Sequence, residues 1–265
     1  MAKILMCSPE FFDIQYEINP WMDINKKTEK SESKRQWQNL HDKFISLGHE
    51  VSVMDGVEGL PDIVYVDCGV LYKDTFIPSN FLYPERQPES EYFSEWFKSN
   101  GFKIRNIDKI YNFEGHGDTL FAGEKLFFGY GFRSSIEAQF KINQALYELG
   151  KVKVVPVELI DSRFYHLDTC FCPLNETEAF YFPGAFSEKA RSILQDEINL
   201  IPVDEDEAGL FCCNAVVLGK DILMPAGARK IKKTLENKGY QVHEIEMGEF
   251  IKGGGACKCL SFIVD

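Results

Sequence analysis

The sequence predicts an α/β protein in which one supersecondary unit is repeated five times. Five helix-like segments each end at a glycine or an asparagine and pass directly into a short β-rich run. The junction residues, spaced 40 to 53 residues apart, are Gly48, Gly101, Gly150, Asn199 and Gly239. Gly and Asn tolerate the left-handed turn that ends many helices, and a regular period of this size signals a repeated structural unit. Five units favour a closed ring with five-fold pseudosymmetry and one central site over an open doubly wound sheet, in which single strands alternate with helices.

Each predicted helix is recognised by apolar residues three or four positions apart, which form one apolar face. In chain order these residues are Trp37, Leu40, Phe44 and Leu47; Tyr92, Phe93, Trp96 and Phe97; Ile136, Phe140 and Leu149; Ile193 and Leu194; and Ile231 and Leu235. Two strand-like runs precede each of the last four helices, for example 63–66 with 75–77 and 215–218 with 222–224. The predicted unit is therefore strand, strand, helix, strand.

The composition is that of a soluble globular protein. Hydrophobic residues make up 45% of the 265 residues and charged residues 26%, which is ordinary for a folded domain. No apolar run is long enough to cross a membrane. Residues 1–6 are too few for a secretory signal and are predicted to form the first strand. We expect a cytoplasmic protein with no membrane partner.

Charge and cysteine content narrow the partners further. The formal net charge of −12 argues against a nucleic-acid partner and is compatible with a cationic substrate. The eight cysteines occur mostly in close pairs, but none has the Cys-x-x-Cys spacing of a zinc ribbon. In a reducing compartment we expect all of them to be thiols.

The C-terminal stretch Gly-Gly-Gly-Ala-Cys-Lys-Cys-Leu-Ser, residues 253–261, is the first candidate for chemistry. Three successive glycines lack Cβ atoms, so a second backbone or a ligand can approach closely. The apolar run 260–264 that follows is long enough for one strand. A cysteine at such an entrance is well placed to be a nucleophile, and the alternative is a small, inert core residue.

A histidine and a carboxylate two residues apart form the second candidate. If the segment around His166 and Asp168 is an extended strand, both side chains point to the same face. A histidine beside a carboxylate can act as a general acid and base near neutral pH. The alternative is an ordinary polar pair on a solvated face.

Further carboxylates lie around a small glycine turn that leads into an apolar strand. Glu114 and Asp118 flank this turn, and Asp67 has a similar position after the predicted strand 63–66. Paired carboxylates in a site share a proton or bind a cation, whereas in an exposed turn they are merely solvated. His116, inside the turn, is interpreted as a turn residue and not as a ligand.

Two arginines follow paired strands and are candidates for binding a carboxylate. Arg86 lies in Pro-Glu-Arg and Arg133 in Gly-Tyr-Gly-Phe-Arg-Ser. A planar guanidinium binds a carboxylate through two parallel hydrogen bonds, so either could hold an amino-acid carboxylate. Taken singly, each is more typical of a surface arginine. The pair Gly129-x-Gly131 lacks the third glycine of a dinucleotide-binding loop.

Taken together, these strings resemble the guanidine-modifying enzymes of the pentein fold. That superfamily includes arginine deiminases, dimethylarginine dimethylaminohydrolases, amidinotransferases and arginine dihydrolases. The resemblance covers nearly the whole chain and is closest to the arginine dihydrolase type. It rests on residues 18–22 (Ile-Asn-Pro-Trp-Met), 114–118 (Glu-Gly-His-Gly-Asp), 129–134 (Gly-Tyr-Gly-Phe-Arg-Ser), 164–174 (Phe-Tyr-His-Leu-Asp-Thr-Cys-Phe-Cys-Pro-Leu), 181–186 (Tyr-Phe-Pro-Gly-Ala-Phe) and 258–260 (Lys-Cys-Leu).

The resemblance implies a single pentein domain over residues 1–265, a five-bladed α/β propeller of ββαβ units. It implies that Cys259 is the nucleophile and His166 the general acid and base. Asp118 and Asp168 would bind the guanidinium with Glu114 in support; the carboxylate that orients His166 is left open. Asn19, Arg86 and Arg133 would hold the α-amino acid end of the substrate.

The expected activity is hydrolysis of the guanidino group of arginine or a methylated arginine, with no metal or organic cofactor. One departure concerns Asp67: arginine dihydrolases carry an asparagine before an Ala-Gly, and this chain has Asp-Cys-Gly. One round of hydrolysis and two rounds are therefore both open. The alternatives are a dimethylarginine dimethylaminohydrolase, an amidinotransferase and a non-catalytic arginine-binding protein. The intact set of Cys259, His166 and Asp118 argues against the binding protein only. Assembly into a homo-oligomer is also left open.

Overall fold

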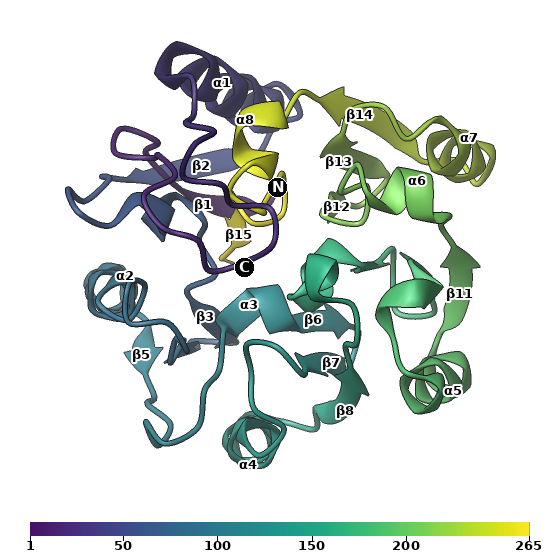
Figure 1. Ribbon diagram of the computed structural model, residues 1–265. Helices are drawn as coiled ribbons and strands as arrows, with labels where there is room; N and C mark the ends of the chain where they lie inside the picture. The colour runs from purple at the N-terminus through teal and green to yellow at the C-terminus, as the bar shows by residue number, and fades with distance from the viewer. Residues whose placement is uncertain (265) are drawn as a thin grey trace. The chain divides into compact units, whose positions relative to one another are not determined.

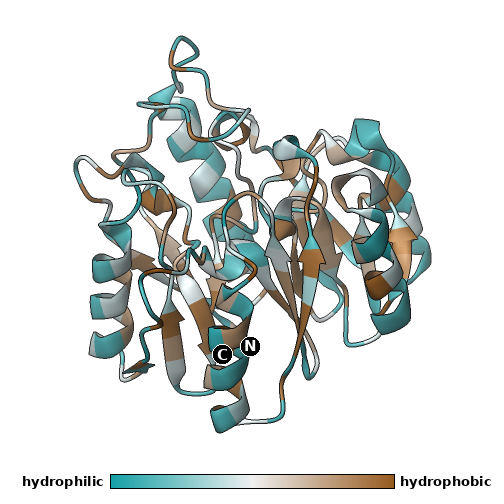
Figure 2. Cartoon of the chain, turned by 60° about the horizontal axis from the view of Figure 1, so that its bottom comes forward, coloured by the Kyte–Doolittle hydropathy of each residue, from teal (hydrophilic) through white to brown (hydrophobic). Residues whose placement is uncertain are grey.

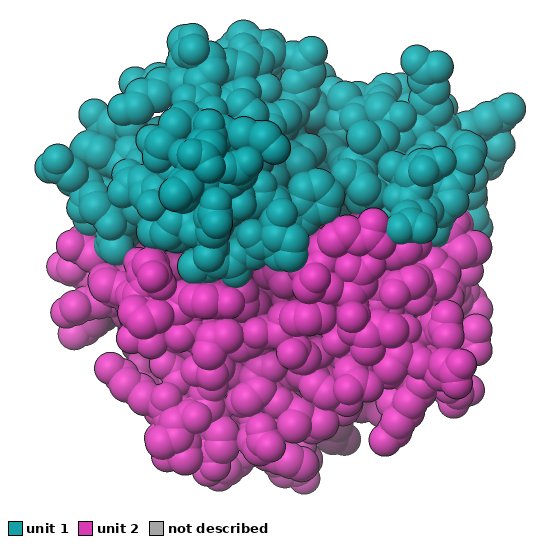
Figure 3. Space-filling view, in the orientation of Figure 1, with its two compact units in different colours: residues 1–66, 203–265 teal, residues 67–202 magenta. Residues whose placement is uncertain are grey.

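The computed structural model describes residues 1–264 and divides the chain into two compact units (Figure 3). The first unit contains Met1–Val66 and the chain from Val203 onward, and the second contains Asp67–Pro202. Five three-stranded sheets are present among the described residues, two in the first unit and three in the second. The expectation of one domain over residues 1–265 stays a prediction.

The second unit contains three repeats of the predicted order strand, strand, helix, strand (Figure 1). In each repeat the first two strands pair antiparallel, and the third strand, reached through a helix, pairs parallel with the middle one. The first repeat consists of β3 (Gly69–Tyr72), β4 (Thr75–Pro78), α2 (Glu89–Ser99) and β5 (Lys103–Ile104). The second consists of α3 (Gly115–Asp118), β6 (Thr119–Ala122), β7 (Lys125–Tyr130), α4 (Ala138–Leu149) and β8 (Lys153–Glu158). The third consists of the 3-10 helices η2 (Ser162–Phe164) and η3 (Leu167–Thr169), β9 (Phe171–Pro173), β10 (Glu178–Tyr181), η4 (Pro183–Ala185), α5 (Glu188–Glu197) and β11 (Asn199–Pro202).

The first unit holds the other two repeats. One has the same order and consists of α6 (Glu205–Ala208), β12 (Val216–Leu218), β13 (Asp221–Pro225), α7 (Arg229–Asn237) and β14 (Gln241–Ile245). The other consists of β1 (Lys3–Cys7), α1 (Lys30–Ser46), β2 (Glu50–Met54), η1 (Pro61–Val64), α8 (Gly248–Ile251) and β15 (Phe262–Ile263). Its antiparallel strand, β15, comes from the C-terminal end of the chain and pairs Ile263 with Ile4. The five-fold repeat predicted from the sequence is thereby confirmed.

The hydrophobic core follows the sheets, and in Figure 2 the strands are largely brown while the helices carry both colours. Most of the predicted helix faces are confirmed: Phe44, Phe97 and Leu194 are each fully buried. The face of α4 was predicted wrongly, because Phe140 is 66% exposed and Ile136 precedes the helix. The buried stripe of α4 is Ala138, Ile142, Ala145 and Leu146. Its two alanines let the helix pack closely on the sheet, where the larger side chains pack. In α2, Tyr92 was also predicted on the apolar face and is exposed.

Two predicted strands are short helical turns instead. The run 63–66 was expected to be a strand, but η1 covers Pro61–Val64, and a proline without an N–H is suited to the first turn of a helix. The strand that pairs with β4 is β3. His166 was expected on a strand with Asp168, but it caps η3, where the hydroxyl and the N–H of Thr169 both donate to its carbonyl.

The junction residues end their helices in two different ways. Left-handed backbone occurs at Gly48, Gly101 and Gly239, as predicted. Gly150 is extended instead, with φ of 176°. A Cβ there would lie 2.5 Å from the Tyr72 hydroxyl, so close packing requires this glycine. Asn199 is the first residue of β11 and ends no helix, so that prediction was wrong.

Candidate active site

The second unit gathers seven of the predicted site residues into one buried cluster. Short elements place them: α3 carries Asp118 and follows Glu114, η3 carries Asp168 and follows His166, and Asp67 lies just before β3. The remaining two are Arg86, which precedes α2, and Arg133, which follows β7. All seven are at most 4% exposed. Buried ionisable groups are costly unless they are paired, so such a concentration marks a functional site.

His166 is held by Glu114 through one ring nitrogen. Its Nε2 lies 2.8 Å from Glu114 Oε2, while its Nδ1 has no hydrogen-bond partner among the described residues and lies 3.9 Å from Asp67 Oδ2. A Cβ on Gly117 would come within 2.8 Å of Nδ1, so this glycine makes room for the ring. Burial lowers the pKa of His166, but Asp118, the Glu114 bond and Asp67 outweigh it and raise the pKa overall.

Glu114 answers the question, open from sequence, of which carboxylate contacts His166. Its carboxylate also accepts from Arg133 Nη1 at 2.7 Å and from the Leu82 N–H at 3.1 Å. Burial opposes ionisation, yet Arg133 and His166 hold the pKa of Glu114 well below its ordinary value. Glu114 is therefore a fixed anion that orients the imidazole and stabilises its protonated form.

Asp118 lies in a different environment from Glu114. It accepts from the Ser134 hydroxyl at 2.6 Å and from the Leu167 N–H at 3.2 Å. Burial raises the pKa of Asp118 to about 6, although His166 and Ser134 act in the opposite direction. The role predicted for Asp118, binding the guanidinium or taking part in catalysis, stays a prediction.

Three residues beside His166 could together hold a cation. Ligand atoms of Asp67, His116 and Asp168 all lie within 4.8 Å of one another, and the three side chains are buried. Arg86 donates to Asp67 Oδ2 at 3.2 Å, whereas Asp67 Oδ1 has no hydrogen-bond partner among the described residues. His116, interpreted from the sequence as a turn residue and not as a ligand, is 5% exposed and lies in this cluster; that interpretation stays a prediction. The spacing suits a metal ion, and two carboxylates equally suit a planar guanidinium.

Both predicted arginines are buried and paired with carboxylates. Arg86 donates to Glu89 through Nε and Nη2 at 2.8 to 3.2 Å and stacks on Phe81, whose ring centre is 4.5 Å away. Arg133 lies over the rings of Tyr83 and Tyr165, with centroid distances of 4.7 and 4.5 Å. The alternative of surface arginines is excluded. Their role in holding a substrate carboxylate stays a prediction.

The first unit holds the predicted nucleophile, Cys259, on the glycine-rich loop. The glycines accommodate a side chain of the same unit: a Cβ on Gly253 would lie 2.2 Å from the Tyr65 hydroxyl, and one on Gly255 2.6 Å from the Tyr65 ring. Cys259 itself is 1% exposed, and its carbonyl accepts from the Val66 N–H at 2.8 Å. Asn19 donates to the Gly253 carbonyl at 3.0 Å, so it is attached to this loop.

The loop ends differently from the prediction, because β15 covers only Phe262–Ile263 of the expected strand 260–264. The other cysteine of the loop, Cys257, is fully buried, and burial raises the pKa of its thiol. One neighbour of Cys259 was missed altogether: Asn214, whose side chain donates to the sulfur at 3.0 Å. It belongs to no motif and lies 45 residues before the cysteine, so no pattern in the sequence could have identified it.

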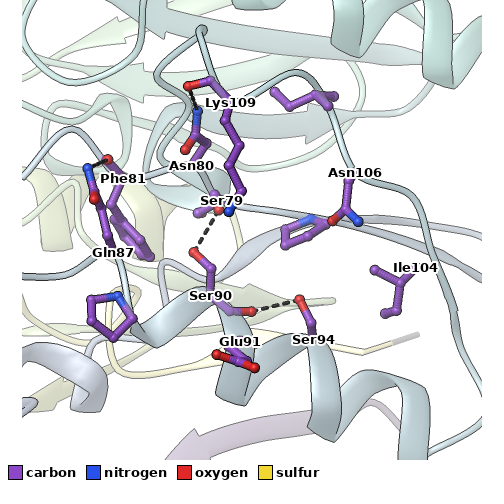
Figure 4. Close-up of a pocket in the computed structure, with 13 residues that line it drawn as sticks. Ser79, Asn80, Phe81, Gln87, Ser90, Glu91, Ser94, Ile104, Asn106 and Lys109 are labelled. Atoms are coloured by element: carbon purple, nitrogen blue, oxygen red, sulfur yellow. Dashed lines mark hydrogen bonds between the residues drawn. The ribbon is translucent and has the colours of Figure 1, made fainter. Parts of the chain in front are cut away.

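A separate hollow in the second unit lies between the start of α2 and the segment 104–109 (Figure 4). Its volume is about 690 Å³. Serine hydroxyls line it, and in Figure 4 Ser90 donates to the Ser79 carbonyl and Ser94 to the Ser90 carbonyl. None of the predicted site residues lines this hollow.

Two further expectations can be compared with the structure. All eight cysteines lie within the described residues and are free thiols, as expected for a reducing compartment. No helix in the described part of the chain is long and apolar enough to cross a membrane.

The chain has the pentein α/β propeller fold that the resemblance implied. The N-terminal domain of ArgZ, an arginine dihydrolase from Cyanobacteria that was crystallised with substrate, matches it with a TM-score of 0.95 and 38% identity. The match covers 100% of this chain and 98% of that one. A variant of the same domain has been captured covalently bonded to a reaction intermediate.

The chain belongs to the N,N-dimethylarginine dimethylhydrolase family, whose eukaryotic model matches residues 12–264. The bifunctional arginine dihydrolase/ornithine cyclodeaminase AgrE of Nostoc sp. is 37% identical over 99% of this chain. This chain spans only 38% of the length of AgrE. The N(G),N(G)-dimethylarginine dimethylaminohydrolase of Mycobacterium tuberculosis is 36% identical over 97% of this chain and 84% of its own length.

Proposed function

We propose that this protein is a cysteine-dependent hydrolase of the guanidino group of arginine or of a methylated arginine. The observation that carries the proposal is the buried pair of His166 and Glu114 beside the carboxylates of Asp67 and Asp168. An imidazole whose charged form is favoured by anionic neighbours can serve as a proton donor next to a bound cation. Family membership and the cysteine on its glycine-rich loop support the same reaction.

The carboxylates make the guanidinium reactive. Its central carbon is a poor electrophile, because the positive charge is delocalised over three nitrogens. Asp67 and Asp168 accept hydrogen bonds from these nitrogens and hold the plane of the group. When the thiolate adds and the carbon becomes tetrahedral, the positive charge of the guanidinium is neutralised, so the buried acceptors contribute mainly by holding the cation in the orientation for attack.

The reaction proceeds in two halves. The thiolate of Cys259 attacks the guanidinium carbon, and His166 donates a proton to the departing amine as the carbon–nitrogen bond breaks. The product of this half is an S-amidino enzyme and a free amine. His166, now neutral, takes a proton from water, which attacks the same carbon and expels the thiolate. Glu114 keeps the imidazole in position and favours its charged form in each half.

Arg133, Arg86 and Asn19 serve the other end of the substrate in this proposal, and Asp118 supports His166 from its bond to Ser134. Arg133, buried over two tyrosine rings, supplies a cation for the α-carboxylate, and Arg86 fixes Asp67 while adding positive charge. Asn19, anchored to the glycine-rich loop, contributes an amide to the α-amino acid end. No organic cofactor enters the chemistry, and the Asp67, His116 and Asp168 cluster holds the substrate cation in place of a metal.

A second candidate is hydrolysis of dimethylarginine, with dimethylamine as the leaving group. The Mycobacterium tuberculosis relative, which this chain covers over most of its length, carries that name. The same cysteine and histidine chemistry serves either substrate. An amidinotransferase would differ only in that an amine, in place of water, takes the intermediate.

We place the protein in the cytoplasm, because all its cysteines are thiols. Its expected partner is a small guanidino compound, the substrate of the proposed reaction. The test of the proposal is to incubate the purified protein separately with arginine, dimethylarginine and agmatine and to identify every product by mass spectrometry. Citrulline or ornithine from either arginine supports the proposal. Unchanged substrates, with binding measured by calorimetry, would show a non-catalytic binding protein instead.

A further inference from the structure

Asn214 connects two segments of the first unit that are distant in sequence. It is fully buried and lies in the loop between α6 and β12. Its side-chain Oδ1 accepts three backbone N–H groups of the nucleophile loop, from Ala256 at 3.0 Å, Lys258 at 3.0 Å and Cys259 at 3.2 Å. The backbone carbonyl of Asn214 also accepts from the Lys258 N–H, at 3.2 Å. One side chain therefore fixes the backbone of Cys259 and of the residues just before it.

These three donors also determine how the amide is oriented. An N–H can donate only to the oxygen of an asparagine, so the oxygen faces the loop backbone, and the nitrogen points to a different group. The nitrogen Nδ2 lies 3.0 Å from Cys259 Sγ. An amide nitrogen has protons but no acceptor capacity, so in this contact the sulfur is the acceptor. A thiolate accepts such a bond more strongly than a thiol does.

The backbone of Asn214 is fixed independently of the loop. Its N–H donates to the Phe211 carbonyl at 2.9 Å, and Phe211 itself has a left-handed φ of 60°. Left-handed backbone is costly for an aromatic residue, so the surrounding structure must hold this turn in place. The turn therefore fixes the backbone from which the Asn214 amide reaches Cys259.

We propose that Asn214 is the positioning residue of the nucleophile: its oxygen shapes the loop, and its nitrogen stabilises the thiolate of Cys259. The inference rests on the proposed role of Cys259 in catalysis. It assigns two separable tasks to the two ends of one amide, and a substitution can remove one task while keeping the other.

Asn214→Asp makes this separation. The carboxylate retains an oxygen for the three loop N–H groups, but in place of the donor it presents a second oxygen to the sulfur. Ser261→Ala is the matched control, because Ser261 is buried in the same loop and its hydroxyl donates to the Cys257 carbonyl at 2.8 Å. The readout is the rate at which iodoacetamide alkylates Cys259 without substrate, followed by peptide mass spectrometry between pH 5 and pH 10.

The expected result is that the pH midpoint of alkylation moves to higher pH in Asn214→Asp. At pH 7 we expect alkylation on the order of tenfold slower, the factor for losing a hydrogen bond to a charged group. Ser261→Ala should retain the parent midpoint. An unchanged midpoint in a folded Asn214→Asp would overturn the proposal and leave the residue as a structural clamp.

If Asn214→Asp does not fold, Asn214→Ala removes the donor without adding charge, but it also removes the oxygen that accepts the loop N–H groups, so its alkylation midpoint is compared together with its melting temperature. Since alkylation needs no turnover, its outcome is independent of the proposed function. A shifted midpoint in a protein that hydrolyses no guanidino compound would refute the proposed reaction and keep the inference. Normal hydrolysis of a guanidino compound with an unshifted alkylation midpoint would support the proposed reaction and refute the inference about Asn214.

Discussion

Asp67→Asn is expected to change how many nitrogens the enzyme removes from arginine. The unpaired Oδ1 of Asp67 is a buried acceptor, suited to a guanidinium that donates hydrogen bonds. Citrulline presents a urea oxygen at the same edge, and two oxygens facing each other repel. The parent should therefore stop after one round and release citrulline. Asparagine has nearly the same shape but adds two N–H donors, which can bind a urea oxygen.

The magnitude follows from the hydrogen bonds exchanged. For arginine, the variant loses one charge-assisted hydrogen bond, about 1.5–3 kcal/mol, which corresponds to a roughly 10- to 150-fold lower kcat/KM. For citrulline, pairing an acceptor that would otherwise be unsatisfied contributes about 1–3 kcal/mol, or roughly 5- to 150-fold. Arg86 keeps its two-pronged contact with Glu89, so the cluster should still fold around the new residue.

The assay follows citrulline and ornithine together from isotopically labelled arginine. The matched control is Glu89→Gln, which removes a buried charge from the other side of Arg86 without changing Asp67. We expect ornithine from Asp67→Asn and none from the control. If the parent already forms ornithine without free citrulline, or if Asp67→Asn forms none while still consuming arginine, this carboxylate does not decide the outcome.

Three further expectations follow. Glu114→Gln removes an anion that raises the pKa of His166, so the alkaline limb of the kcat/KM profile should move to lower pH, and an unmoved limb would contradict the role of Glu114. The free energy of unfolding should fall by about 3–5 kcal/mol, because Arg133 loses a buried partner. Arg133→Lys should lower kcat/KM about tenfold more for arginine than for agmatine, which lacks the α-carboxylate, whereas equal losses would show that this carboxylate is not read. Dialysis against EDTA should leave turnover unchanged, and a loss restored by zinc would show that the acidic cluster beside His166 is a metal site.

The repeat was predictable because its signals are local. Apolar residues at helical spacing and turn residues at a regular period mark each unit within about 50 residues. The pairing of β15 with β1 was not predictable, because it joins opposite ends of the chain. The face of α4 was misread for a related reason: size drew attention to Phe140, while tertiary packing selected Ala138 and Ala145.

In the site, the residue types could be predicted but not their contacts. The sequence pointed to His166 and several carboxylates, yet only the turn of α3 and the start of η3 decide that Glu114 meets the imidazole. His116 was interpreted as a turn residue because it lies inside the glycine turn, and its burial beside Asp67 and Asp168 depends on contacts that the sequence does not show. The role of Asn214 could not be predicted from the sequence, because it depends on contacts with a loop that is distant along the chain.

The central claim is that Cys259 is the nucleophile, and the most direct measurement is turnover of the preferred guanidino substrate by Cys259→Ser beside Cys257→Ser. The two residues share one buried loop, so each variant controls for damage to the fold caused by the other. A serine hydroxyl is far less nucleophilic than a thiolate at neutral pH. We predict that Cys259→Ser loses turnover by at least about a thousandfold while still binding substrate, and that Cys257→Ser stays within a few-fold of the parent. Turnover by Cys259→Ser within a few-fold of the parent, or its loss only in Cys257→Ser, would contradict the account.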